Sequence, residues 1–249
     1  MAAPVFCSIF CYALAKISGE RWPEIRAKEL AEAAHGEGQS SWPGFRTLAN
    51  LVRLRPVQTY VDGSTLITKA RSRASGEFLR SGSDVWVTID DDVEAPKETL
   101  EALLEAVIRT RAIVSVPCIL RDGTGLTVQA HRQDKRRVDG NLYRLDDGTG
   151  LGLVAFHHDV IKKLAPMVPH VTARGQDFPA LFQEDVRDGE WIGEDYRMTR
   201  LAARMGIAVY LLLDAPVVHA GLACQMTRDL ELLVDKKTRE SLVKAGASA

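Results

Sequence analysis

The chain lacks the cysteine patterns that define disulfide-rich and zinc-finger proteins. Its four cysteines, Cys7, Cys11, Cys118 and Cys224, form no CxxC pair and have no histidine at zinc-finger spacing. Scattered cysteines of this kind are typical of reduced thiols packed in a core. The sequence therefore predicts neither a disulfide framework nor a structural zinc site, and we expect a cytoplasmic protein.

An excess of one charge and a long apolar run are also absent. The chain has 32 basic and 33 acidic residues, a formal net charge of −1. Bulk electrostatics thus give no reason to expect tight binding to nucleic acid or to a membrane. The apolar segment from Pro4 to Ile17 has no basic stretch before it and is too short to span a bilayer. We expect no membrane partner.

What is present is the composition of an ordinary globular chain. It has 249 residues, 46% of them hydrophobic, and shows neither repeats nor low-complexity tracts. This length suits one large α/β domain with a well-filled core. We divide residues 1–249 into two halves of a single domain, 4–120 and 121–225, followed by a C-terminal helix over 226–249.

Strand-like and helix-like segments alternate along the chain, which predicts a mostly parallel central sheet flanked by helices. The predicted strands are Val5–Phe10, Val57–Val61, Val85–Ile89, Ile113–Leu120, Leu151–Phe156 and Ile207–Leu213. The predicted helices are Pro23–Ala34, Phe45–Leu54, Ser64–Leu79, Pro96–Ile108, Ile161–Leu164 and Gly193–Met205. Three glycine-containing turns between Arg121 and Gly148 predict a small β-hairpin region laid over the sheet.

Three carboxylates, Asp90, Asp91 and Asp92, directly follow the apolar strand Val85–Ile89. Like charges this close raise one another's pKa, and a divalent metal is the usual partner that reverses the penalty. In open α/β sheets the carboxyl end of a strand is also where ligands bind. The sequence therefore predicts a metal site here, with a solvated turn that caps the next helix as the alternative.

Further motifs occur in a fixed order around this cluster. They are Val61-Asp62-Gly63-Ser64-Thr65, Lys69-Ala70-Arg71-Ser72, Asp90-Asp91-Asp92, Gly193-Glu194-Asp195 and His219-Ala220-Gly221. In this order the sequence resembles the GT-A-fold glycosyltransferases with a DxD motif, over roughly Val57 to Gly221. The turn after Val61 lacks the second acidic residue that the family often has there. The resemblance implies a single GT-A-like (Rossmann-like) domain, with nucleotide sugar bound by residues 4–120 and acceptor by 121–225.

The resemblance also implies cofactors and ligands. A divalent cation that bridges both phosphates of a nucleotide sugar acts as a Lewis acid on the leaving group. We expect Mn²⁺ or Mg²⁺ and a UDP-sugar as the favoured donor. The expected metal ligands are Asp92, Asp90 and His219. The expected donor-binding residues are Asp62, Arg71, Asp90, Asp91, Gly150 and Gly152.

Some of these assignments keep a plain structural alternative. Alternation along an extended chain points Asp91 away from Asp90 and Asp92. A single histidine such as His219 is commonly a hydrogen-bonded packing residue. Hairpin geometry explains Gly150 and Gly152 as well as close approach of a ligand does.

The acidic pair Glu194 and Asp195 supplies the candidate base. An acceptor hydroxyl loses its proton as it attacks the anomeric carbon, and a carboxylate near the leaving group suits that role. We predict Asp195 as the base, with Glu194 second, and hence inversion of the sugar. An ordinary acidic helix start, favoured by the helix dipole, is the alternative.

The acceptor is less defined, and the sequence does not indicate an oligomeric state. The basic stretch His131–Arg137 is either a solvated loop or a contact to DNA carrying a hydroxylated base such as 5-hydroxymethylcytosine. A glycan or a small molecule is the other acceptor class.

The sequence is less compatible with two functions outside glycosyl transfer. A sugar-phosphate nucleotidyltransferase would show a glycine-rich basic loop after the first strand, where Cys11–Ala15 stands instead. A non-catalytic binding module would be favoured by loss of Asp90 or Asp92, and both are present.

Overall fold

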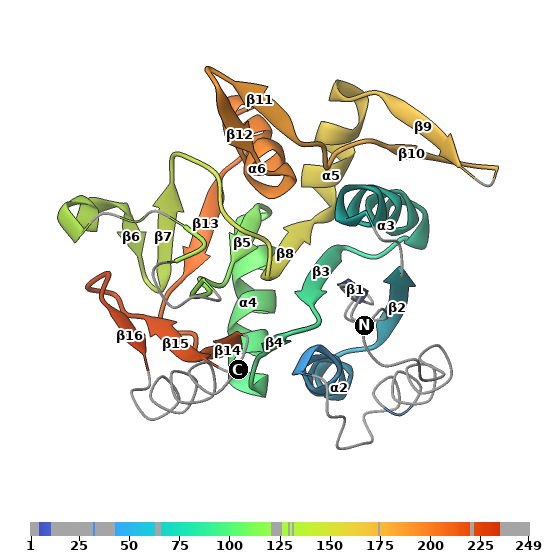
Figure 1. Cartoon of the computed structure of the whole chain (residues 1–249). Coiled ribbons are helices and arrows are strands. Elements are labelled where there is room, and N and C mark those ends of the chain that lie inside the picture. The colour runs from blue at the N-terminus through green and yellow to red at the C-terminus, as the bar shows by residue number, and fades with distance from the viewer. Residues whose placement is uncertain are drawn as a thin grey trace, which may run out of the picture.

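An eight-stranded sheet forms the centre of the molecule (Figure 1). The computed structural model describes residues 5–10, 32, 43–62, 66–120, 126–128, 130, 132–173, 175–219 and 222–234. The sheet strands, in spatial order, are β2 (Val57–Asp62), β1 (Val5–Phe10), β3 (Val85–Asp90), β8 (Leu153–His157), β5 (Ile113–Ser115), β13 (Val209–Leu212), β7 (Leu142–Leu145) and β6 (Val138–Asp139). In this sheet β8 and β7 run opposite to the other six strands. The mostly parallel sheet predicted from the sequence is confirmed.

Alternation along the strands gives the sheet an apolar surface on both faces. Val5 and Cys7 of β1 belong to one buried cluster, while Phe6 between them belongs to the other. Because successive side chains of a strand point to opposite faces, each face needs its own cover. The first face is covered by α2 (Pro43–Leu54) and α4 (Lys97–Thr110). The second is covered by α3 (Ile67–Ser81), α5 (His158–Leu164) and α6 (Glu194–Arg204).

The remaining strands form smaller sheets around the edges of the central one. A four-stranded sheet has the order β16 (Leu232–Val234), β15 (Leu222–Met226), β14 (Val217–His219), β4 (Val93–Glu94). Two hairpins, β9 (His170–Ala173) with β10 (Gln176–Pro179) and β11 (Asp185–Arg187) with β12 (Glu190–Ile192), lie at the top of Figure 1 beside α5 and α6. Two 3-10 helices are η2 (Arg132–Arg137) and η3 (Ala165–Met167). Among the described helices none combines the length and apolar character needed to cross a bilayer.

The predicted C-terminal helix is wrong in its first part. The chain forms β15 up to Met226, turns, and returns as β16, whose Leu232 to Val234 pair with Met226 to Cys224. The turn is closed by the hydrogen bond from Thr227 N–H to Glu231 O at 2.9 Å. Strand pairing with β15 thus overrides the local helix preference of this leucine-rich segment. Residues 235–249 lie outside the described residues.

Three other predictions differ in detail. The strand predicted over Ile113–Leu120 is only β5, because Pro117 has no N–H to continue the ladder. The hairpin β6–β7 extends the sheet edge beside β13 and does not cover the sheet. The predicted cap Ser64 lies outside the described residues, and Leu66 occupies the N-cap of α3. Of the helix predicted over Pro23–Ala34, only Glu32 is described, and it is helical.

Trp86 of β3 is the best test of the second buried cluster. Its ring is fully buried, lies 5.0 Å from the Phe156 ring and 5.8 Å from the Phe78 ring, and its Nε1–H donates to Ser8 Oγ at 2.9 Å. We expect Trp86→Ala to lower the free energy of unfolding by about 3–5 kcal/mol, as other large-to-small core substitutions do. Urea titration followed by circular dichroism measures this. Trp191→Ala is the control, since that ring is 70% exposed and should change stability by no more than about 0.5 kcal/mol.

Candidate functional site

The acidic cluster lies at the carboxyl end of β3, in the middle of the sheet. Asp90 is the last residue of β3, Asp91 and Asp92 form a turn, and β4 begins at Val93. The Asp90 N–H donates to Gly152 O at 2.9 Å, so the strand end is tied to the segment that enters β8. Burial raises the pKa of Asp90; the Arg71 guanidinium acts against this, and the Asp92 carboxylate adds to it.

Helix α2 packs against the backbone of this turn, a contact that the sequence does not predict. The Gly44 N–H donates to Asp91 O at 3.1 Å, and a Cβ on Gly44 would lie 2.9 Å from the Asp91 Cα. Thr47 Oγ1 donates to Val93 O at 2.8 Å and accepts from Ala95 N–H at 2.9 Å. The turn is therefore held by backbone contacts that need glycine at position 44, while Asp91 is itself buried against α2.

His219 reaches the cluster from a part of the sequence more than a hundred residues away. β14 pairs with β4 so that His219 lies opposite Val93. Its Nε2 is 3.5 Å from Asp92 Oδ1, and its Nδ1 donates to Ile119 O at 2.5 Å. Burial alone would lower the pKa of His219, but Asp92 and the Ile119 carbonyl raise it above its ordinary value. His219 and Asp92, both predicted as metal ligands, thus lie in contact.

Arg71 of α3 connects the acidic turn to α6. Its Nη2 donates to Asp90 Oδ1 at 2.9 Å and its Nη1 donates to Glu194 Oε1 at 2.7 Å. The guanidinium side chain is only 5% exposed. Burial alone would lower the pKa of Arg71, but Asp90, Glu194 and Asp195 raise it. Arg71 is therefore a fixed cation among three carboxylates.

Glu194 and Asp195 begin α6, and their surroundings differ. Glu194 is paired with Arg71, whereas Asp195 Oδ1 accepts from Tyr196 N–H at 2.7 Å. Burial raises the pKa of Asp195, and the neighbouring Glu194 charge raises it further. A carboxylate whose pKa is raised is a better proton acceptor at neutral pH than one held by a guanidinium. Asp195, predicted as the base, and Glu194, predicted second, therefore have different partners.

The other predicted donor-binding residues occupy different surroundings. A Cβ on Gly152 would lie 3.3 Å from Cys118 Sγ and 3.9 Å from Asp90 Oδ2, so Gly152 allows the backbone to pack closely beside Asp90. Gly150 packs against Thr127, whose Cβ would lie 2.7 Å from an added Cβ. Asp62 ends β2 on the same sheet edge as Asp90, since both pair with Phe10 of β1. Its side chain lies outside the described part of the chain.

The donor set at the turn fits a divalent cation that also binds its substrate. In the described part of the chain, no three His, Cys, Asp or Glu side chains are grouped to hold a metal by themselves. Asp92 and His219 form a pair, and Asp90 ends the strand that leads into the same turn. Cations such as Mg²⁺ commonly use one or two protein carboxylates and take their other ligands from water and substrate phosphates. A site of this incomplete kind fits the residues present.

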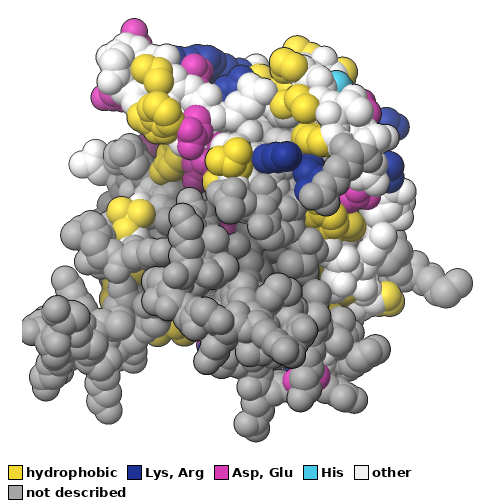
Figure 2. All heavy atoms as spheres, turned by 45° about the vertical axis from the view of Figure 1, so that its right-hand side comes forward, with side chains coloured by type: hydrophobic (Ala, Val, Ile, Leu, Met, Phe, Trp, Pro, Cys, Tyr) yellow, Lys and Arg dark blue, Asp and Glu magenta, His cyan; other side chains and the backbone are white. Residues whose placement is uncertain are grey.

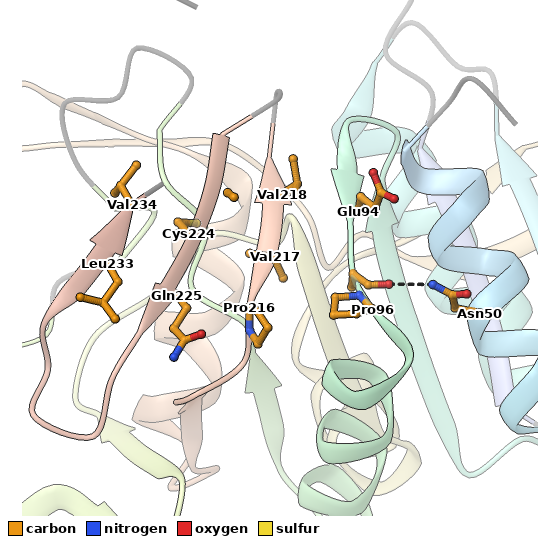
Figure 3. A pocket seen from close by; sticks show the side chains of 12 residues that line it. Asn50, Glu94, Pro96, Pro216, Val217, Val218, Cys224, Gln225, Leu233 and Val234 are labelled. Carbon is orange, nitrogen blue, oxygen red and sulfur yellow. Dashed lines mark hydrogen bonds between the residues drawn. The ribbon is translucent and has the colours of Figure 1, made fainter. Parts of the chain in front are cut away.

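An apolar groove of about 620 Å³ lies behind the site (Figure 3). Val218 and its partner Glu94 line it, together with Pro96, Pro216 and Leu233. Their neighbours His219 and Val93 point to the other face of the ladder, since side chains alternate along strands. The ladder between β4 and β14 therefore separates the groove from the acidic turn.

Comparisons with known proteins bear on the fold. No protein-family model matches the chain, and no curated protein matches it. Among solved structures, the chain is similar to GalNAc-T7 in a crystal structure with UDP, GalNAc and Mn²⁺, with a TM-score of 0.51 and 10% identity over 88% of this chain. The match spans 44% of the GalNAc-T7 chain. A second similar structure is A197 from STIV, with a TM-score of 0.48 and 13% identity over 93% of this chain and 94% of that chain. The likeness to GalNAc-T7 confirms the GT-A-like α/β fold.

Gly44→Ala tests whether α2 supports the acidic turn. Glycine to alanine within a helix ordinarily raises stability by about 0.5–1 kcal/mol. Here the new Cβ would lie 2.9 Å from the Asp91 Cα and 3.0 Å from the Asp90 carbonyl oxygen. We expect the free energy of unfolding to fall by about 1–3 kcal/mol, as for overpacked cores. Chemical denaturation measures it, and Arg53→Ala on the exposed side of α2 is the control. A stabilised Gly44→Ala protein would show that the contact is not needed.

Proposed function

We propose that this protein is a metal-dependent glycosyltransferase that moves a sugar from a nucleotide donor to a hydroxyl acceptor. One observation carries the proposal. The pair Asp92–His219 and the pair Glu194–Asp195, far apart in sequence, meet at one sheet edge, where Arg71 joins the two sides. The pair Asp92–His219 suits a cation and a diphosphate, and the pair Glu194–Asp195 suits proton transfer from an acceptor.

Asp92 and His219 are the proposed metal ligands. A carboxylate together with an imidazole suits Mn²⁺, and carboxylate with water suits Mg²⁺. When bound, such a cation supplies Lewis-acid stabilisation of the departing nucleoside diphosphate. Asp90 Oδ1 accepts a hydrogen bond from Arg71, and Oδ2 is the second oxygen of the same carboxylate. That oxygen can accept a hydrogen bond from a ribose hydroxyl. The UDP and Mn²⁺ of the GalNAc-T7 structure support a UDP-sugar donor and manganese.

Asp195 is the proposed base. It would take the proton of the acceptor hydroxyl as the oxygen attacks the anomeric carbon, and a single displacement of this kind inverts the sugar configuration. The raised pKa of Asp195 supports this role. Glu194, held by Arg71 at 2.7 Å, is the weaker candidate because its lone pairs already accept a charged hydrogen bond.

Contacts of the basic stretch favour a glycan or a small molecule over DNA as acceptor. Lys135 Nζ lies 2.6 Å from Asp229 Oδ1, and Arg137 pairs with Asp146 and Asp134. Cations already neutralised by carboxylates release few counterions from DNA. Figure 2 shows acidic, basic and hydrophobic side chains interspersed over the described part of one face. A hydroxylated DNA base is therefore the less favoured acceptor.

Thermal stability measured with nucleotide sugars tests the donor and metal site. We expect one family of donors, UDP-sugars first, to raise the melting temperature only when Mn²⁺ is present. A ligand at a hundred times its Kd adds about 2.7 kcal/mol, which is a shift of about 5–10 °C for a chain of this size. Asp92→Asn should abolish the shift. Asp139→Asn, an exposed residue of β6, should retain it.

Two results would contradict this reading of the site. Equal shifts for Asp92→Asn and the wild type would place the metal elsewhere. Release of pyrophosphate from UTP and a sugar phosphate, without transfer from a UDP-sugar, would identify a nucleotidyltransferase.

Kinetics of Asp195→Asn and Glu194→Gln test the assignment of the base. Removing a general base lowers turnover by about 10²–10⁴-fold. We expect this loss in kcat for Asp195→Asn, with the donor KM nearly unchanged, and a smaller loss for Glu194→Gln. Initial rates of transfer with the donor found by thermal shift measure both. The reverse order of losses would make Glu194 the base.

A further inference from the structure

One buried cation joins elements that carry the two halves of the site. Arg71 comes from α3, Asp90 ends β3, and Glu194 begins α6. The two hydrogen bonds, at 2.9 Å and 2.7 Å, use different nitrogens of the same guanidinium. A planar guanidinium fixes the directions of its donors, so two partners on separate elements are held in a defined relative position. A lysine ammonium has no such fixed fork.

Because the ion pair between Arg71 and Glu194 is buried, it is sensitive to the loss of either partner. The side chains of Arg71 and Glu194 are 5% and 12% exposed. Breaking a buried pair by removing one partner leaves a charge without compensation, which is strongly unfavourable. Arg71 therefore restricts Glu194, and with it the first turn of α6, more than an exposed ion pair would.

The first turn of α6 is anchored to other elements by the Tyr196 hydroxyl, which donates to Thr127 O at 2.9 Å, and by the contact of Arg71 with Glu194. Met198, Thr199 and Ala202 are the buried residues of the helix, all beyond Glu194 and Asp195. The N-cap Gly193 has no side chain to hold the helix start. Among the hydrogen bonds of the described residues, the one from Arg71 ties the side chain of Glu194 to another element. Asp195 follows Glu194 directly, so the position of its carboxylate depends on the same turn.

We propose that Arg71 is a positioning residue. Its hydrogen bonds to Glu194 and Asp90 hold the start of α6, which carries the proposed base, near the end of β3, which carries the proposed metal site. We call this link the Arg71 tether. This inference rests on the proposed function. The sequence predicts that Arg71 contacts the donor. In this proposal Arg71 instead acts indirectly, by fixing the positions of Glu194 and Asp195. Misplacement of a reacting group by about 1 Å can lower the rate by about 10²-fold, so such a tether matters for turnover.

A double-mutant cycle between Arg71→Lys and Glu194→Gln tests the tether. We expect Arg71→Lys to lower kcat by about 10–100-fold and to leave the donor Kd within about threefold. If the two residues act through one contact, the double variant should be no slower than the slower single variant. Arg80→Lys, on the exposed side of the same helix and paired with Glu77, is the matched control. Multiplicative losses, or a weakened donor Kd with an unchanged kcat, would overturn the proposal.

Hydrogen exchange gives a readout that needs neither donor nor metal. The amide N–H of Arg197 donates to Gly193 O at 2.9 Å and reports on the first turn of α6. We expect the amides of Arg197, Met198 and Thr199 to exchange about tenfold faster in Arg71→Lys, with the amides of β13 unchanged. Arg71→Gln is the second variant if the lysine variant fails to fold. Unchanged exchange at α6 in a folded variant would contradict the tether.

The two proposals fail in different ways. A wild-type protein that binds no nucleotide sugar with Mn²⁺ ends the proposed function, and the exchange experiment still decides whether Arg71 holds α6. A wild-type protein that transfers sugar, with independent effects of Arg71 and Glu194, ends the tether alone.

Discussion

The site depends on one constraint: the negative charges of the carboxylates at one sheet edge must be balanced by nearby cations. The charge of Asp92 acts on Asp90 and that of Glu194 acts on Asp195, and burial raises the pKa of Asp90 and of Asp195. Such a cluster is stable only where cations are fixed nearby. Arg71 supplies one cation on the side of α6, and His219 faces Asp92 on the other side. The site is thus divided into a half compensated by Arg71 and a half where His219 and a metal can share Asp92.

The fold provides this division through secondary elements outside the central parallel strands. The ladder between β4 and β14 delivers His219 to the turn, and Gly44 of α2 allows the helix to reach the backbone of Asp91. Backbone hydrogen bonds and close packing fix these contacts better than exposed side-chain pairs would. The positions of Asp92 and His219 therefore follow from how the four-stranded sheet joins the eight-stranded sheet.

Parts of this arrangement can be predicted from sequence because they are local. An apolar run followed by Asp90 identifies the strand end, and Gly193 before two acidic residues identifies the start of α6. The contacts of Arg71 and Gly44 cannot be found this way, since each depends on partners that only the tertiary fold brings close. The sequence pattern predicts a helix at Leu232–Val234, where the structure has a strand, for the same reason. Its conformation is set by pairing with β15, and the local pattern of apolar residues fits either structure.

The geometry of the proposed site also bears on the order in which metal, donor and acceptor bind. Asp90 Oδ1 accepts from Arg71, which leaves Asp92 and His219 as the residues proposed to bind a cation. Two protein ligands hold Mn²⁺ or Mg²⁺ weakly, so the phosphates of the donor are needed to complete the coordination. Metal and nucleotide sugar should then bind together, each raising the affinity for the other. In the proposed site, Arg71 and Glu194 need no such ligand, so the half proposed to receive the acceptor is formed before the donor arrives.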